Sequence, residues 1–75
     1  MANNYYEQQR LNRIQSIQKW INEESPIQYE KARAEICLLY GVSRDTAREY
    51  LEMLETAEKI EVGEDEEITY TAEEA

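Results

Sequence analysis

Apolar side chains recur every three or four residues in three stretches of this chain, a spacing that predicts three helices. The first helix is expected from about Glu7 and ends before Pro26, because proline lacks an amide hydrogen and disfavours a helical residue before it. Its apolar face consists of Leu11, Ile14, Ile17 and Ile21, with Trp20 at the edge. Residues 1–6 offer little to bury and are expected to form a disordered lead-in.

The second helix is predicted from about Gln28 to Tyr40, and the third from about Arg44 to Glu58. Gly41 can end the second helix, because glycine adopts positive φ without a steric penalty. Ser43 is a preferred N-cap, whose hydroxyl accepts a hydrogen bond from an unpaired amide of the helix that follows. The two apolar faces comprise Ala32, Ile36, Leu39 and Tyr40, with Cys37 beside them, and then Ala47, Tyr50, Leu51 and Leu54.

After Glu58 the apolar period changes to two, which is typical of strands. Ile60 and Val62 predict one strand, Ile68 and Tyr70 another, and residues 63–67 the loop between them. Ile27 is expected to add a short extended segment, and residues 72–75 to form a disordered tail. The predicted fold is mainly α with a small β-hairpin, in a single domain. Its predicted core is Leu11, Ile14, Ile17, Ile21, Ile36, Leu39, Val42, Ala47, Tyr50, Leu51, Leu54, Ile60, Val62 and Ile68.

The run 40–43, followed by 46–51 and Leu54, resembles the turn and recognition helix of winged helix-turn-helix regulators. The resemblance continues through Leu51, Leu54, Ala57 and the strand-like 59–62, and covers about Leu11 to Tyr70. It implies three helices with a wing of two or three strands. It also implies a DNA-binding transcription regulator, similar to small ones encoded by archaea, their viruses or plasmids. Winged helices also serve as protein-interaction modules, which is the alternative function.

This resemblance makes the third helix the candidate recognition helix. Arg44 and Arg48 lie four residues apart, so both project from one face and can reach guanine edges or phosphates of double-stranded DNA. The full set of candidate DNA-binding residues is Gln28, Lys31, Arg33, Ser43, Arg44, Asp45, Thr46 and Arg48. The alternative is an ordinary solvated face, on which Arg48 pairs with Glu52 or Arg44 with Asp45. About four phosphate contacts would bind weakly, and a homodimer on a palindromic site would compensate.

Charge is distributed unevenly along the chain. The net charge is −9, but residues 1–60 carry 8 basic and 10 acidic residues, whereas residues 61–75 carry 7 acidic residues and no basic one. The predicted wing therefore has an acidic tip, Glu64–Glu67, where DNA-binding wings usually have lysine or arginine, and it is not expected to enter the minor groove. It aids solubility, docks a basic protein partner, or competes with DNA for Arg44 and Arg48. Glu58 stands where many relatives have glycine, so a less sharply turned helix end is expected.

Composition excludes several other classes of function. The chain has no histidine and one cysteine, so we expect no metal site, no cofactor and no catalytic residues. The lone cysteine indicates an intracellular, cytoplasmic protein, and no apolar run approaches the roughly 20 residues that span a bilayer. The polar start predicts no signal peptide. Tyr6 and Trp20 are the candidate dimer-interface residues, because the first helix of the resembled regulators is a frequent dimer surface.

Overall fold

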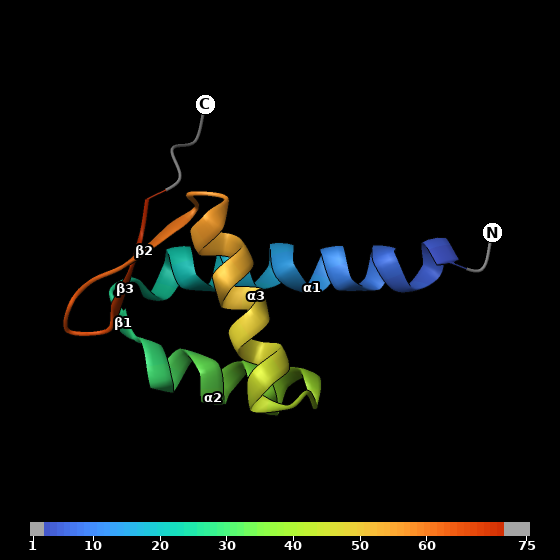
Figure 1. Ribbon diagram of the computed structural model, residues 1–75, viewed down its shortest axis with the longest axis horizontal. Helices are drawn as coiled ribbons and strands as arrows, with labels where there is room; N and C mark the ends of the chain where they lie inside the picture. The colour runs from blue at the N-terminus through green and yellow to red at the C-terminus, as the bar shows by residue number, and fades with distance from the viewer. Residues whose placement is uncertain (1–2, 72–75) are drawn as a thin grey trace.

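The computed structural model describes residues 3–71, and the side chains of residues 7–71. Six elements follow one another: α1 (Asn3–Glu24), β1 (Ile27–Gln28), α2 (Tyr29–Tyr40), α3 (Arg44–Thr56), β2 (Ile60–Val62) and β3 (Glu67–Tyr70). The prediction of three helices with a small antiparallel sheet is confirmed. In Figure 1, the axes of α1 and α2 run roughly parallel, α3 lies across both at a steep angle, and the sheet covers one end of the molecule.

The sheet has three antiparallel strands in the order β1-β3-β2. The predicted contribution of Ile27 is confirmed, because Ile27 pairs with Ile68 on one side of β3 and Val62 pairs with Ile68 on the other. Ile68 is fully buried at this crossing. The short strand β1 thus joins the start of α2 to the hairpin, and the orientation of α2 depends on that pairing.

The core lies where α1, α2 and α3 meet the sheet. It comprises Ile14, Ile17, Ile21, Ile27, Ala32, Ile36, Ala47, Tyr50, Leu51, Leu54, Ile60 and Ile68. Most of the predicted core is therefore confirmed, with Val42 and Val62 half-buried at its edge. The prediction that Leu11 and Leu39 are buried is wrong, because these side chains are 48% and 61% exposed.

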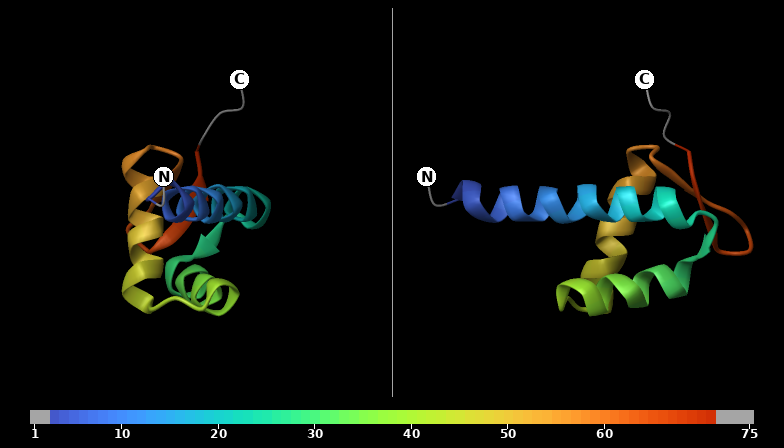
Figure 2. Two further views of the ribbon diagram at one scale, coloured as in Figure 1. Left: turned by 90° about the vertical axis from the view of Figure 1, so that its right-hand side faces the viewer. Right: turned by 180° about the vertical axis from the view of Figure 1, so that it is seen from behind.

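The error at Leu11 occurs where α1 extends past its neighbours. Figure 2 shows the N-terminal half of α1 reaching beyond the other elements, and Leu11 lies on this part. Leu39 belongs to the last turn of α2, where Tyr40 instead packs at the edge of the core. Helix α1 also begins at Asn3 rather than about Glu7, so residues 3–6 are helical and not the disordered lead-in predicted. Residues 72–75 lie outside the described residues.

The end of α3 is a second correction. The helix ends at Thr56, and Glu58 follows with φ 63°, in the left-handed region that favours glycine. The amide of Lys59 donates to the Leu54 carbonyl at 2.9 Å, and the amide of Glu58 to the Glu55 carbonyl at 3.0 Å. These two bonds form a Schellman motif. The expectation of a less sharply turned helix end is thus wrong. A glutamate occupies the left-handed position, where glycine would carry no steric penalty.

Candidate nucleic-acid interface

The connection from α2 to α3 forms as its sequence predicts. Gly41 has φ 64°, and its amide donates to the Cys37 carbonyl at 2.9 Å, which closes α2. The Ser43 hydroxyl accepts the Thr46 amide at 3.1 Å, so Ser43 is the N-cap of α3. The same hydroxyl donates to the Thr46 side-chain oxygen at 3.1 Å. The hydroxyls of Ser43 and Thr46, both predicted to contact DNA, therefore bond to each other, and the Ser43 cap fixes the start of α3.

Arg44 and Arg48 are exposed on α3, with 71% and 58% of their side chains accessible. The interpretation that Arg48 pairs with Glu52 is confirmed, at 3.2 Å, and this hydrogen bond raises the pKa of Arg48. The other pairing is wrong, because Arg44 pairs not with Asp45 but with Glu30 of α2, at 2.9 Å. Consecutive residues of a helix do not face each other, whereas the turn at Gly41 brings α2 and α3 side by side.

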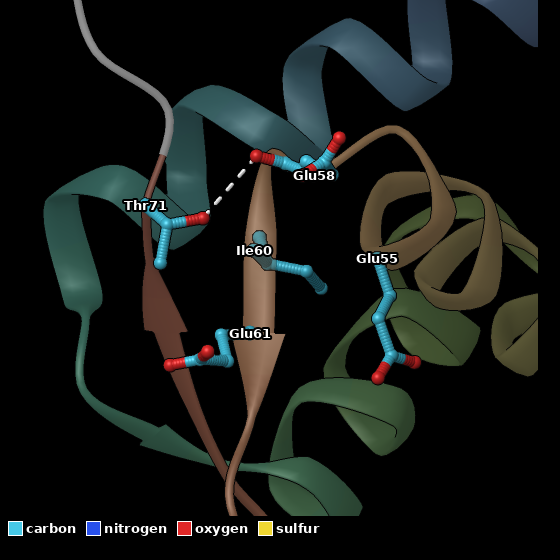
Figure 3. A pocket seen from close by; sticks show the side chains of 5 residues that line it. All are labelled: Glu55, Glu58, Ile60, Glu61 and Thr71. Atoms are coloured by element: carbon cyan, nitrogen blue, oxygen red, sulfur yellow. Dashed lines mark hydrogen bonds between the residues drawn. The ribbon is translucent and has the colours of Figure 1, made fainter.

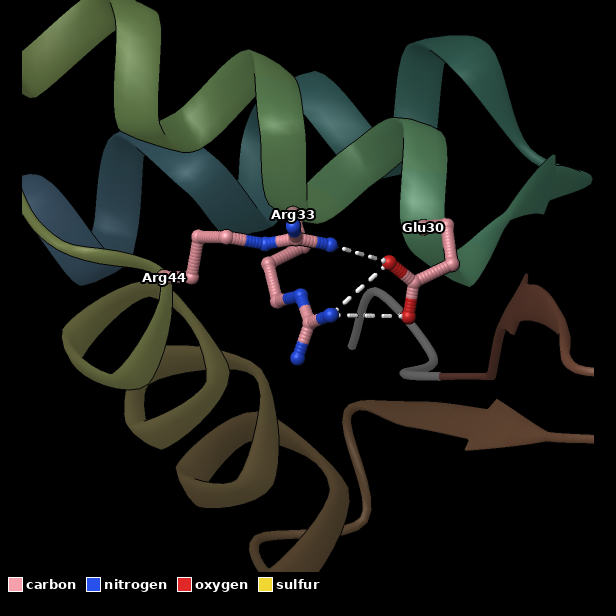
Figure 4. Close-up of polar contacts among 3 residues, drawn as sticks. All are labelled: Glu30, Arg33 and Arg44. Atoms are coloured by element: carbon pink, nitrogen blue, oxygen red, sulfur yellow. Dashed lines mark hydrogen bonds and ion pairs between the residues drawn. The ribbon is translucent and has the colours of Figure 1, made fainter.

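Glu30 also holds Arg33, and sequence reasoning missed this role. One guanidinium nitrogen of Arg33 lies 2.8 Å and 3.0 Å from the two carboxylate oxygens of Glu30 (Figure 4). The spacing of three residues between Glu30 and Arg33 was a readable signal for this pair, but nothing local links Glu30 to Arg44. The structure therefore brings two of the predicted DNA-binding residues, Arg33 and Arg44, to one carboxylate.

The remaining predicted residues lie around this cluster without joining it. Gln28 ends β1 and Lys31 lies in the first turn of α2, and both are exposed. Asp45 is exposed in the first turn of α3, a favourable place for a negative charge near a helix N-terminus. It also adds an acidic group where a phosphate would approach, so it opposes the two arginines.

Tyr29 lies between the charged side chains of the two helices. The Arg33 guanidinium carbon is 5.9 Å from its ring centroid. Burial raises the pKa of Tyr29, and the Glu52 carboxylate raises it further, whereas Arg33 and Arg48 oppose the rise. The pKa of Tyr29 thus depends on charged side chains of both α2 and α3 at the candidate interface.

The overall charge of this surface is acidic. Helix α3 carries two arginines and four acidic residues, Asp45, Glu49, Glu52 and Glu55. At the hairpin loop, Glu64–Glu66 are exposed and Glu67 is half-buried. In the described part of the chain, the carboxylates paired with Arg44 and Arg48 come from α2 and α3 and not from this loop. The positive charge on the interface is therefore local and already paired.

An acidic hollow, with no arginine among its lining residues, lies at the junction of α3 and the sheet. It encloses about 400 Å³ and is lined by Glu55, Glu58, Ile60, Glu61 and Thr71 (Figure 3). The Thr71 hydroxyl donates to the Glu58 carbonyl at 3.2 Å, which joins β3 to the end of α3. Among residues 3–71, no three histidine, cysteine or acidic side chains are grouped so as to hold a metal ion.

Of the two candidate dimer residues, Trp20 and Tyr6, the structure describes the side chain of Trp20 alone. Trp20 is half-buried and packs against the core. Tyr6 lies in α1, but its side chain is outside the described residues. Leu11 and Met53 are exposed apolar residues on α1 and α3 that line a shallow hollow with Ile14. The dimer interface stays a prediction.

Comparison of the chain with protein-family models, with curated proteins and with solved structures finds no match. Within the described residues, no helix is both long enough and apolar enough to cross a membrane.

Proposed function

We propose that this protein is a double-stranded DNA-binding regulator that uses α3 as its recognition helix. The observation that carries the proposal is the exposed, capped start of α3, which presents Arg44 and Arg48 from one side of the molecule. The order of helices and strands, with β1 pairing to a terminal hairpin, is compatible with a winged-helix layout. The N-terminus of a helix also attracts phosphate.

The ion pairs of the two arginines are compatible with this role. Arg44, Arg48 and their glutamate partners are all more than half exposed. Exposed ion pairs contribute only about 0–1 kcal/mol, so DNA phosphates can replace the carboxylates at small cost. The acidic charges of α3 and the hairpin loop lower the affinity, however. We therefore propose weak binding by one domain and stronger binding by a homodimer on two half-sites.

Fluorescence anisotropy of a labelled random-sequence duplex tests this function. We expect binding at low salt that falls about 150-fold between 50 and 200 mM, the loss for roughly four phosphate contacts. The double variant Arg44→Ala, Arg48→Ala should lose this binding. The matched control is Lys19→Ala, Lys59→Ala, which removes the same charge from exposed positions outside α3. Equal losses in both variants would show that only net charge matters, and absence of wild-type binding at low salt would contradict the proposal.

The acidic surface favours a second candidate, a module that binds a basic protein partner. The specific observation is that the tip of the hairpin, Glu64–Glu66, is exposed and is not paired with the arginines of α3. Arg44 and Arg48 are dispensable for this function, whereas they are required for DNA binding. Changing Glu64, Glu66 and Glu67 to glutamine should abolish partner binding in this case, and should tighten any DNA binding by removing repulsion.

A further inference from the structure

Two guanidinium groups from different helices converge on a single oxygen atom. Arg33 of α2 and Arg44 of α3 each place a terminal nitrogen near one carboxylate oxygen of Glu30, at 2.8 Å and 2.9 Å (Figure 4). Arg33 also donates to the second oxygen at 3.0 Å. We call Arg33 and Arg44 the arginine pair. It defines a position for an anionic group with two adjacent oxygens, and Glu30 fills that position from within the chain.

The members of this cluster differ in how firmly they are held. Only 18% of the Arg33 side chain is exposed, its guanidinium lies over the Tyr29 ring, and its Nε atom is buried without a hydrogen-bond partner in the described structure. Glu30 and Arg44 are 56% and 71% exposed. Arg33 is therefore a fixed donor, whereas the carboxylate and Arg44 can move apart by rotation of exposed side chains.

A phosphodiester can replace the carboxylate of Glu30. Its two non-bridging oxygens match the two carboxylate oxygens, and arginine binds both kinds of group through paired N–H donors. The site faces the same side as the start of α3, because Arg44 is the first residue of that helix. A DNA strand contacting α3 would thus approach the arginine pair, and the negative charge of Glu30 would repel its phosphates.

We propose that the arginine pair is a phosphate-binding site and that Glu30 is its built-in competitor. The inference rests on the proposed function for the source of the phosphate, the backbone of double-stranded DNA. Glu30 lowers affinity twice over, by occupying both guanidinium groups and by repelling an incoming phosphate. Replacing it with neutral glutamine removes the competing negative charge while keeping the shape of the side chain.

The first experiment uses inorganic phosphate and needs no DNA. The full chain is titrated with phosphate, and the Nε–H resonances of Arg33 and Arg44 are followed by NMR. In Glu30→Gln we expect both resonances to shift with about 5-fold higher affinity than in wild type, and adding Arg44→Ala to remove the effect. The control is Glu35→Gln, which removes the same charge from α2 at a residue outside the cluster. Equal titrations of the Glu30 and Glu35 variants would overturn the inference.

The second experiment measures duplex binding by the same variants. Relative to Glu35→Gln, we expect Glu30→Gln to bind DNA on the order of 5-fold more tightly, with a salt slope steeper by about 0.9, the value for one more phosphate contact. If wild type binds DNA but the two variants behave alike in both experiments, the inference fails and the proposed function stands. If no variant binds DNA while phosphate binds Glu30→Gln, the phosphate site stands and the proposed function fails.

Discussion

The backbone amide of Tyr29 donates a 2.8 Å hydrogen bond to the carbonyl oxygen of Glu66. Tyr29 is the first residue of α2, and its N-cap residue Gln28 makes no side-chain capping bond. The first amides of a helix lack partners within the helix. The hairpin loop therefore supplies the cap that the local sequence lacks, and it ties the position of α2 to the conformation of a distant loop.

We expect Glu66→Gly to stabilise the protein, because Glu66 has φ 61° and glycine adopts that conformation freely. The gain should be about 0.5–1 kcal/mol, the cost of a left-handed residue less the added entropy of glycine in the unfolded chain. Thermal unfolding measures it. The matched control is Glu64→Gly, which removes a charge from the same loop at a residue without positive φ and should destabilise. Equal effects would mean that charge, and not backbone conformation, is responsible.

The apolar period predicts which face of each helix is buried, but not where along the helix its neighbours end. Ile14, Ile17 and Ile21 were predicted inside and are buried, whereas Leu11, one turn earlier on the same face, is exposed. The relevant fact is the length of the body that α1 crosses, which depends on how α3 and the sheet pack. The local sequence of α1 does not determine that length.

The contrast between two leucines tests this account of the core. Leu51 is 1% exposed and Leu39 is 61% exposed, although both lie on predicted apolar faces. Leu51→Ala should cost about 2–5 kcal/mol of unfolding free energy, because it leaves a cavity. Leu39→Ala should change it by no more than about 0.5 kcal/mol, as for other surface substitutions. Urea unfolding of both variants measures the difference, and comparable losses would place Leu39 inside.

The candidate site was only partly readable from sequence. The cap at Ser43, the turn at Gly41 and the pairing of Arg48 with Glu52 depend on residues at most four apart, and local patterns predict such features. The pairing of Arg44 with Glu30 spans 14 positions and depends on how α2 packs against α3. For that reason, Glu30 was absent from the predicted residues.

Glu58 gives a prediction about the end of α3. Glycine at this position should relieve the left-handed conformation, so Glu58→Gly is expected to raise the free energy of unfolding by about 0.5–1 kcal/mol. The control Glu55→Gly removes a carboxylate from the same hollow but lies within the helix, where glycine should cost about 1 kcal/mol. Urea unfolding should therefore show a higher free energy of unfolding for Glu58→Gly and a lower one for Glu55→Gly. A loss of stability in both variants would contradict the Schellman geometry.

The raised pKa of Tyr29 predicts a loss of stability at alkaline pH. Burial and the Glu52 carboxylate favour the neutral phenol in the folded state, so its pKa exceeds the ordinary value of 10.0. The stabilising contribution is fully present below that value and is lost as pH rises through the folded pKa. Between about pH 9 and pH 11, the wild type should therefore lose more stability than Tyr29→Phe, which has no group to ionise at this position. Urea midpoints across this range measure the difference, since the other tyrosines are common to both proteins. Parallel pH profiles would show that the environment of Tyr29 between α2 and α3 does not favour the neutral phenol.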